Sequence, residues 1–123
     1  MNRPVLFDTN ILIDLFCGRI EAKQTMDLYP PQHAISLITW MEVMVGAKRF
    51  HQENQTRMAL SAFDVIGVSL EIAERGVSLR QEYGMKLPDA IILATAHLHR
   101  RELVTRNTKD FAGLPGVILP YSL

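Results

Sequence analysis

The amino-acid sequence predicts a three-layer α/β/α fold, in which helices cover both faces of a central, mostly parallel sheet of four to five strands. Short apolar runs, typical of buried strands, alternate along the chain with segments whose apolar residues recur at helical spacing. Strands that alternate with helices in this way indicate a parallel sheet. The length of 123 residues is sufficient for one hydrophobic core and too short for two. We therefore expect a single domain over residues 1–123.

The first expected strand covers residues 5–7, which are apolar at consecutive positions and so suit a strand covered on both faces. Asp8 follows on a strand-to-helix turn, and apolar residues then recur at helical spacing as far as Phe16. A second helix is expected over residues 21–28. It ends before Pro30, because proline cannot donate a hydrogen bond in a helix interior.

The next unit begins with a short strand over residues 33–35. Ser36 is the expected N-cap of the helix that follows, which runs towards Gly46. A polar stretch over residues 48–57 then leads to another helix that ends near Phe63.

The C-terminal half repeats this alternation, beginning with a third strand over residues 64–68. Ser69 can cap the helix after it, and Gly84 ends that helix. Pro88 suits the first turn of a further helix, which is apolar almost all round as far as Leu98 and is therefore expected to be buried. The last expected elements are a strand over residues 102–105, a short turn or helix over 108–112 and an edge strand over 117–119.

Four acids lie in largely apolar stretches near the starts of helices or the ends of strands, namely Asp8, Glu42, Asp89 and Asp110. Buried charges cost several kcal/mol unless they are paired or bind a metal, and few opposite charges stand nearby in the sequence. Carboxylate oxygens suit Mg²⁺ or Mn²⁺, so the four acids predict a site for a hard divalent cation. For Asp8 the alternative interpretation is a helix N-cap, since its side chain can accept hydrogen bonds from the first turn.

At these positions the chain resembles the PIN-domain nucleases, and most closely the VapC toxins of bacterial toxin–antitoxin pairs. The resemblance covers nearly the whole chain and rests on four segments in order. They are Asp-Thr-Asn at residues 8–10, Ser-x-x-Thr-x-x-Glu-Val at 36–43, Pro-Asp-Ala-x-Ile-x-Ala at 88–94 and Val-Thr-Arg-Asn-Thr-x-Asp-Phe at 104–111. The resemblance implies a single PIN domain that acts as a metal-dependent endoribonuclease.

We expect Asp8, Glu42 and Asp89 to be the principal carboxylates for Mg²⁺ or Mn²⁺, in agreement with the resemblance, and Asp110 to be an outer one. The metal would activate a water molecule and stabilise charge on the phosphate as the P–O bond breaks. The polar residues expected to orient water or to hydrogen-bond the carboxylates are Thr9, Asn10, Thr39 and Asn107. Many relatives carry an acid at the position of Asn107, which leaves two candidates for the fourth ligand. A further alternative for Asp110 is to cap the short helix or to pair with a neighbouring cation.

The resemblance also implies a homodimer and a cognate VapB-type antitoxin as partners of the chain, beside the RNA substrate. The hydrophobic content of 48% agrees with apolar surface that a partner covers, whereas the formal net charge of zero gives no sign of nucleic-acid binding. No apolar run approaches the roughly 20 residues needed to span a bilayer, and no signal peptide is apparent, so we expect a cytoplasmic protein without membrane contact.

Other residue types favour structural roles. Cys17 is expected to be a small buried hydrophobe and not a reactive thiol. His97 and His99 point in different directions on a helix, so they cannot readily share a metal. Trp40 suits a core or dimer interface better than base stacking. The basic pairs that begin at Lys48 and Arg100 suit helix C-termini.

Three other functions are weighed against the nuclease. A phosphatase that forms an aspartyl-phosphate on Asp8 would need an acid where Asn10 stands. A signalling receiver domain would need an acidic pair after the first strand and an aspartate after the third strand, whereas Asp64 precedes that strand's apolar run. The remaining alternative is a PIN-like module that binds RNA or protein without catalytic activity.

Overall fold

The computed structural model describes residues 3–123, which form one five-stranded sheet with the strand order β3-β2-β1-β4-β5. All neighbouring strands are parallel, so the α/β fold with four to five mostly parallel strands is confirmed. The strands are β1 (Val5–Phe7), β2 (Ala34–Ser36), β3 (Asp64–Ile66), β4 (Glu102–Val104) and β5 (Val117–Ile118). The helices are α1 (Thr9–Phe16), α2 (Ile20–Asp27), α3 (Leu37–Arg49), α4 (Glu53–Leu60), α5 (Leu70–Tyr83), α6 (Leu87–Leu98) and α7 (Thr108–Phe111).

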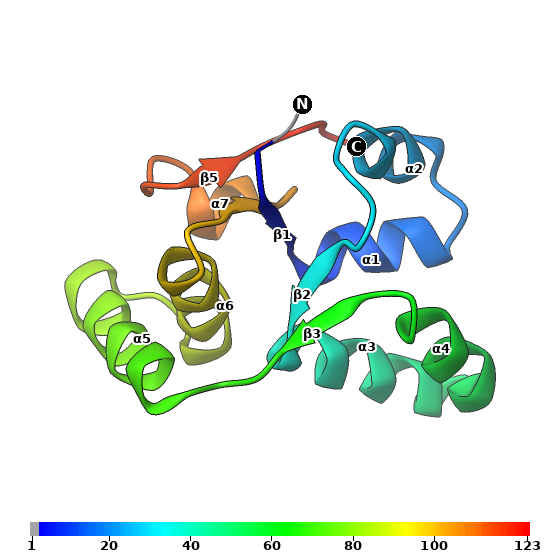
Figure 1. Ribbon diagram of the computed structural model, residues 1–123, viewed down its shortest axis with the longest axis horizontal. Coiled ribbons are helices and arrows are strands. Elements are labelled where there is room, and N and C mark those ends of the chain that lie inside the picture. The colour runs from blue at the N-terminus through cyan, green and yellow to red at the C-terminus, as the bar shows by residue number, and fades with distance from the viewer. Residues whose placement is uncertain (1–2) are drawn as a thin grey trace.

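Helices cover both faces of the sheet, with α1 to α4 on one side and α5 and α6 on the other (Figure 1). Alternate residues of the central strands supply the two cores, as the pleat of a strand requires. Leu6 and Leu103 pack with the α5–α6 pair, whereas Phe7 and Val104 pack with α1 to α4. The sheet is therefore buried on both faces, which explains why its strands are apolar at consecutive positions.

The helix ends follow the local chemistry of the sequence. The Ser36 hydroxyl accepts a hydrogen bond from the Ile38 amide at the start of α3, and the Ser69 hydroxyl does the same for Ile72 at the start of α5. Gly84 ends α5 in the left-handed conformation with φ of 67°, which glycine adopts without steric cost. These three predicted helix ends are confirmed.

Several element bounds differ from those predicted from the sequence. The helix expected to end near Phe63 stops at Leu60, because the chain needs a turn before it enters β3. The helix that begins after Ser36 continues past Gly46 to Arg49, where basic residues complement the dipole of its last turn. The strand expected over residues 64–68 ends at Ile66; it is an edge strand, so a neighbour pairs with it on one side only.

Among residues 3–123, no helix is both long and apolar enough to cross a membrane. The cytoplasmic location stays a prediction.

Candidate functional site

The four predicted acids come together at the carboxyl edge of the sheet. Asp8 directly follows β1, and Asp110 lies in α7 after β4, the strand that pairs beside β1. The charges of Asp89 and Glu42 act on Asp8, while those of Asp110 and Glu42 act on Asp89. Each of the four carboxylates is therefore close enough to at least one other for their charges to interact, and their joint role in a site stays a prediction.

Asp8 is the buried member of the set, with a relative exposure of 3%. Its Oδ1 accepts a hydrogen bond from the Thr9 amide at 2.8 Å, so Asp8 is the N-cap of α1 as well as a site residue. Its Oδ2 accepts from the Thr105 hydroxyl at 2.7 Å and from Asn10 Nδ2 at 3.4 Å. The N-cap interpretation and the site interpretation of Asp8 are thus compatible, since each uses a different oxygen.

Thr105 is a site residue that the sequence interpretation missed. Its side chain is fully buried, and its hydroxyl donates to Asp8 while accepting from Asn10 Nδ2 at 3.2 Å and from the Asn107 amide at 3.1 Å. Its position directly after β4 was the available signal, because the carboxyl ends of neighbouring parallel strands meet at one edge. The hydroxyl fixes the orientation of the buried carboxylate without adding charge.

Glu42 lies in α3 and is exposed to solvent, although its neighbours in the sequence are largely apolar. Only Asp8 is buried, whereas Asp89 and Asp110 are partly exposed. The apolar neighbours of Glu42 in α3 are not all buried: Val43 is 5% exposed, whereas Met41 and Val45 are 43% and 64% exposed. Thr9 Oγ1 donates to Glu42 Oε1 at 2.6 Å. It also lies 3.1 Å from the hydroxyl of the fully buried Thr39.

Asn107 and Asp110 are joined by two hydrogen bonds at the start of α7. Asn107 Oδ1 accepts from the Asp110 amide at 3.1 Å, and Asn107 Nδ2 donates to Asp110 Oδ2 at 2.9 Å. Asn107 is therefore the N-cap of α7, and the alternative that Asp110 caps this helix is wrong. The structure also pairs Arg106 with Asp14 and not with Asp110.

Burial and like charges raise the proton affinity of two of these acids. Burial, together with the nearby charges of Asp89 and Glu42, raises the pKa of Asp8 to about 6, although hydrogen bonds from Thr105 and Thr9 oppose the shift. The pKa of Asp89 is raised by burial and by the charges of Asp110 and Glu42, while Lys86 opposes the shift. A site that holds two carboxylates above their usual pKa values attracts a cation.

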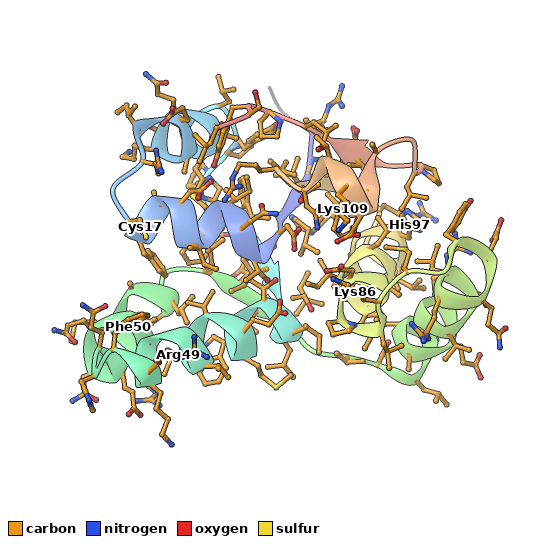
Figure 2. All side chains as sticks on the ribbon, turned by 180° about the vertical axis from the view of Figure 1, so that it is seen from behind. Cys17, Arg49, Phe50, Lys86, His97 and Lys109 are labelled. Carbon is orange, nitrogen blue, oxygen red and sulfur yellow. The ribbon has the colours of Figure 1, made fainter. Side chains whose placement is uncertain are left out.

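Two lysines stand beside these acids, Lys86 as the N-cap residue of α6 and Lys109 next to Asp110 in α7 (Figure 2). Both side chains are exposed.

The donor set fits a hard divalent cation in its chemistry, since it consists of carboxylate oxygens. Among residues 3–123, however, no three Asp, Glu, His or Cys side chains converge closely enough to enclose an ion as they stand. Hydrogen bonds hold three of the acids towards neutral partners: Asp8 to Thr105, Glu42 to Thr9 and Asp110 to Asn107. Mutual repulsion favours such separation until a cation neutralises the acids, so we expect small side-chain rotations to accompany binding.

Other predictions from single residues have mixed outcomes. Cys17 is exposed, so its predicted burial is wrong. It is the C-cap of α1, beyond the apolar stripe that includes Ile11 and Leu12, and it faces the end of α3 near Phe50 (Figure 2). Trp40 packs against the core on the α1 to α4 side of the sheet, as one of its two expected structural roles requires.

The chain is similar in sequence and in structure to known proteins. The family described as the PIN domain matches residues 5–116. The chain is 27% identical to Ribonuclease VapC1 of Rickettsia felis, over 92% of each chain. It is 73% identical to a chain of a toxin–antitoxin complex from Klebsiella pneumoniae, with a TM-score of 0.93 and coverage of 97% of this chain and 99% of that one. A structure of VapBC2 from Rickettsia felis bound to promoter DNA shares the fold, with a TM-score of 0.76 and 23% identity over 96% of each chain.

Proposed function

Because the chain belongs to the PIN-domain family, we propose that it is a metal-dependent endoribonuclease and the toxin of a VapBC-type toxin–antitoxin pair. We propose also that residues 1–123 form a single PIN domain. The catalytic part of the proposal rests on one observation: four carboxylates lie at one edge of the sheet, near enough for their charges to act on one another. The similarity to proteins named ribonucleases supports RNA as the substrate.

In this proposal Asp8, Glu42 and Asp89 hold the metal, which is Mg²⁺ or Mn²⁺ because the donors are hard oxygens. When bound, the metal supplies positive charge that activates water for attack on the phosphate and stabilises the charge that develops as the P–O bond breaks. Asp110 acts as an outer acid. Its orientation is set by Asn107, which donates to Asp110 Oδ2.

The chain's own hydroxyl groups orient the acids. Thr105 and Asn10 both donate to Asp8 Oδ2, so two hydrogen bonds from neutral groups set the orientation of this carboxylate. Thr9 donates to Glu42 Oε1, and the contact between Thr9 and the buried Thr39 limits the positions that the Thr9 hydroxyl can adopt. Asn10 donates to both Thr105 and Asp8, and so ties the first turn of α1 to the end of β4.

The activity is tested with purified protein and a mixed RNA substrate in the presence of Mg²⁺ or Mn²⁺. We expect cleavage that stops in EDTA and returns when excess metal is added. Undiminished cleavage in EDTA would overturn the metal mechanism. RNA binding without any cleavage would favour a PIN-like binding module.

The exposed apolar surface supports the proposed protein partners. Ile13, Phe16, Val43 and Phe50 line a groove of about 250 Å³ between α1 and the end of α3. Ile13 and Phe50 are 47% and 67% exposed, which is typical of surface that a partner covers. We propose a cognate VapB-type antitoxin and a second copy of this chain as partners, without assigning either to this groove.

The partners are tested by expression with and without the neighbouring gene. Expression of the chain alone should arrest growth, and co-expression of the antitoxin should relieve the arrest. The mass of the purified protein should correspond to a dimer. A harmless monomer that retains no small protein during purification would contradict this part of the proposal.

A further inference from the structure

A second buried carboxylate lies outside the acidic edge and is fully paired. Asp14, in α1, has a relative exposure of 5% and accepts two hydrogen bonds from Arg106, from Nε to Oδ2 at 2.6 Å and from Nη2 to Oδ1 at 2.9 Å. The hydroxyl of Tyr121, in the C-terminal tail, donates to Asp14 Oδ2 at 2.8 Å. Three segments far apart in the sequence therefore meet at one carboxylate. We call these three residues the Asp14 anchor.

The geometry of the Asp14 anchor is more specific than the core requires. Two apolar side chains of similar volume would fill the same space, and such replacements of buried ion pairs are often neutral or stabilising. A bidentate pair fixes the position of the guanidinium in direction as well as distance. Because both Nε and Nη2 are used, Arg106 is held by its planar group and not by charge alone.

Arg106 stands between two residues that each hold one acid of the candidate site. Thr105 donates to Asp8 and Asn107 donates to Asp110. The backbone amide of Arg106 itself donates to Asn10 Oδ1 at 3.1 Å. The tripeptide of residues 105–107 therefore connects the acid at the end of β1 with the acid in α7, and the side chain of its middle residue is bound to α1.

We propose that Arg106 is a positioning residue of the candidate metal site. Asp14 and Tyr121 hold Arg106 in place. Its neighbours Thr105 and Asn107 then keep the carboxylates of Asp8 and Asp110 in the orientations that metal binding needs. In this proposal the guanidinium acts through its backbone neighbours, because Asp14 engages its Nε and Nη2. The inference rests on the proposed function in one respect, namely that the acids bind a metal. It adds that the C-terminal tail takes part in setting the geometry of the site.

The first test compares Arg106→Gln with a matched control, Arg101→Gln. Arg101 is also partly buried and donates to the Val5 carbonyl, but it does so at the opposite end of β1. The Mn²⁺ dissociation constant is measured by calorimetry on the full chain. We expect Arg106→Gln to weaken Mn²⁺ binding by about 10–100-fold, the range typical of residues that orient metal ligands, and Arg101→Gln to leave it within about 3-fold of the wild type.

A second variant separates positioning from simple stabilisation. The double change Asp14→Leu with Arg106→Met replaces the buried pair by apolar groups of similar size and should restore much of the melting temperature that Arg106→Gln loses. We expect Mn²⁺ binding to stay at least about 10-fold weaker in this variant, and hydrogen exchange of the Arg106 and Asp110 amides to be faster than in wild type. Recovery of Mn²⁺ affinity together with stability would overturn the inference and make the Asp14 anchor purely structural.

The wild-type measurements distinguish failure of the inference from failure of the proposed function. If the wild type binds Mn²⁺ and cuts RNA while the double variant has normal affinity, the inference fails and the proposed function stands. If the wild type binds no Mn²⁺ and cuts no RNA, both are overturned.

Discussion

Asp8 and Asp14 are buried to nearly the same extent, with exposures of 3% and 5%, yet their electrostatic surroundings are opposite. Asp8 receives hydrogen bonds from neutral groups only and stands near two other carboxylates, so burial and repulsion raise its pKa to about 6. Burial also raises the pKa of Asp14, but hydrogen bonds from Arg106 and Tyr121 outweigh it and the net shift is downward. Helix α1 and its N-cap thus hold two different carboxylates. Asp8 accepts hydrogen bonds from neutral groups, whereas Asp14 is paired with the guanidinium of Arg106.

We propose that the difference separates a functional group, Asp8, from a structural one, Asp14. A chain that only needed to fold would pair both aspartates, because an unpaired buried charge is costly. At Asp8 the chain provides neutral donors that orient the carboxylate and leaves its charge available. We propose that a divalent metal neutralises the charge of Asp8.

The largest expected effect comes from removing the charge of Asp8. Asp8→Asn keeps the shape of the side chain and loses the ligand charge, so it should reduce RNA cleavage by more than about 100-fold, beyond the range of residues that act on ligands indirectly. The fold should remain intact, because one of several repelling acids is removed. Cleavage rates and melting temperatures of the purified variant check this. Retained activity with a large drop in melting temperature would mean that Asp8 is structural.

A smaller effect is expected at the outer acid. Asp110→Asn should weaken Mn²⁺ binding and cleavage by about 10–100-fold, and excess Mn²⁺ should restore part of the rate. Asn107→Asp adds an anion at the position where relatives often carry one, and should tighten metal binding. Titration of Mn²⁺ against cleavage rate measures both. Full activity of Asp110→Asn at limiting metal would make Asn107 the better candidate for the fourth position.

The contrast between the two aspartates also predicts opposite pH dependences for the metal-free protein. Folding raises the pKa of Asp8 from 3.8 to about 6, so its contribution to stability is full below the lower value and is lost as pH rises through the higher one. The loss is at most about 3 kcal/mol. Melting temperatures in EDTA should therefore be higher at pH 5 than at pH 7.5, and Asp8→Asn should reduce this difference. An unchanged pH dependence in Asp8→Asn would assign the effect to other groups.

For Asp14 the sign is reversed, and the expected change is the smallest of the four. Its pKa is lowered in the folded protein, so its stabilising effect is present above the ordinary pKa and lost as pH falls through the folded value. At neutral pH, Asp14→Asn should lower the free energy of unfolding by about 2 kcal/mol, since it weakens charge-assisted hydrogen bonds. Denaturant unfolding at pH 7 measures this. A variant as stable as the wild type would show that the pairing with Arg106 has no net stabilising effect.

Local patterns in the sequence were sufficient for the alternation of strands and helices, the helix caps at Ser36 and Ser69 and the position of Asp8, because each depends on residues a few places apart. The apolar neighbours of Glu42 in the sequence did not show that its side chain is exposed, because they do not indicate which face of a helix a residue occupies. Thr105 and the pairing of Asp14 with Arg106 were missed for a different reason. These contacts join residues more than ninety positions apart, and no short-range pattern reports them.

The order of the strands in the sheet bears on how the protein is made. Strand β1 is synthesised first and lies between β2 and β4, with Val5 opposite Glu102 in the register. A ribosome adds roughly 5–20 residues per second, so one edge of β1 stays open for several seconds until β4 is made. Thr105 and Asp110 are made after β1, β2 and β3, so a nascent chain lacks a complete acidic edge until β4 and α7 have been synthesised.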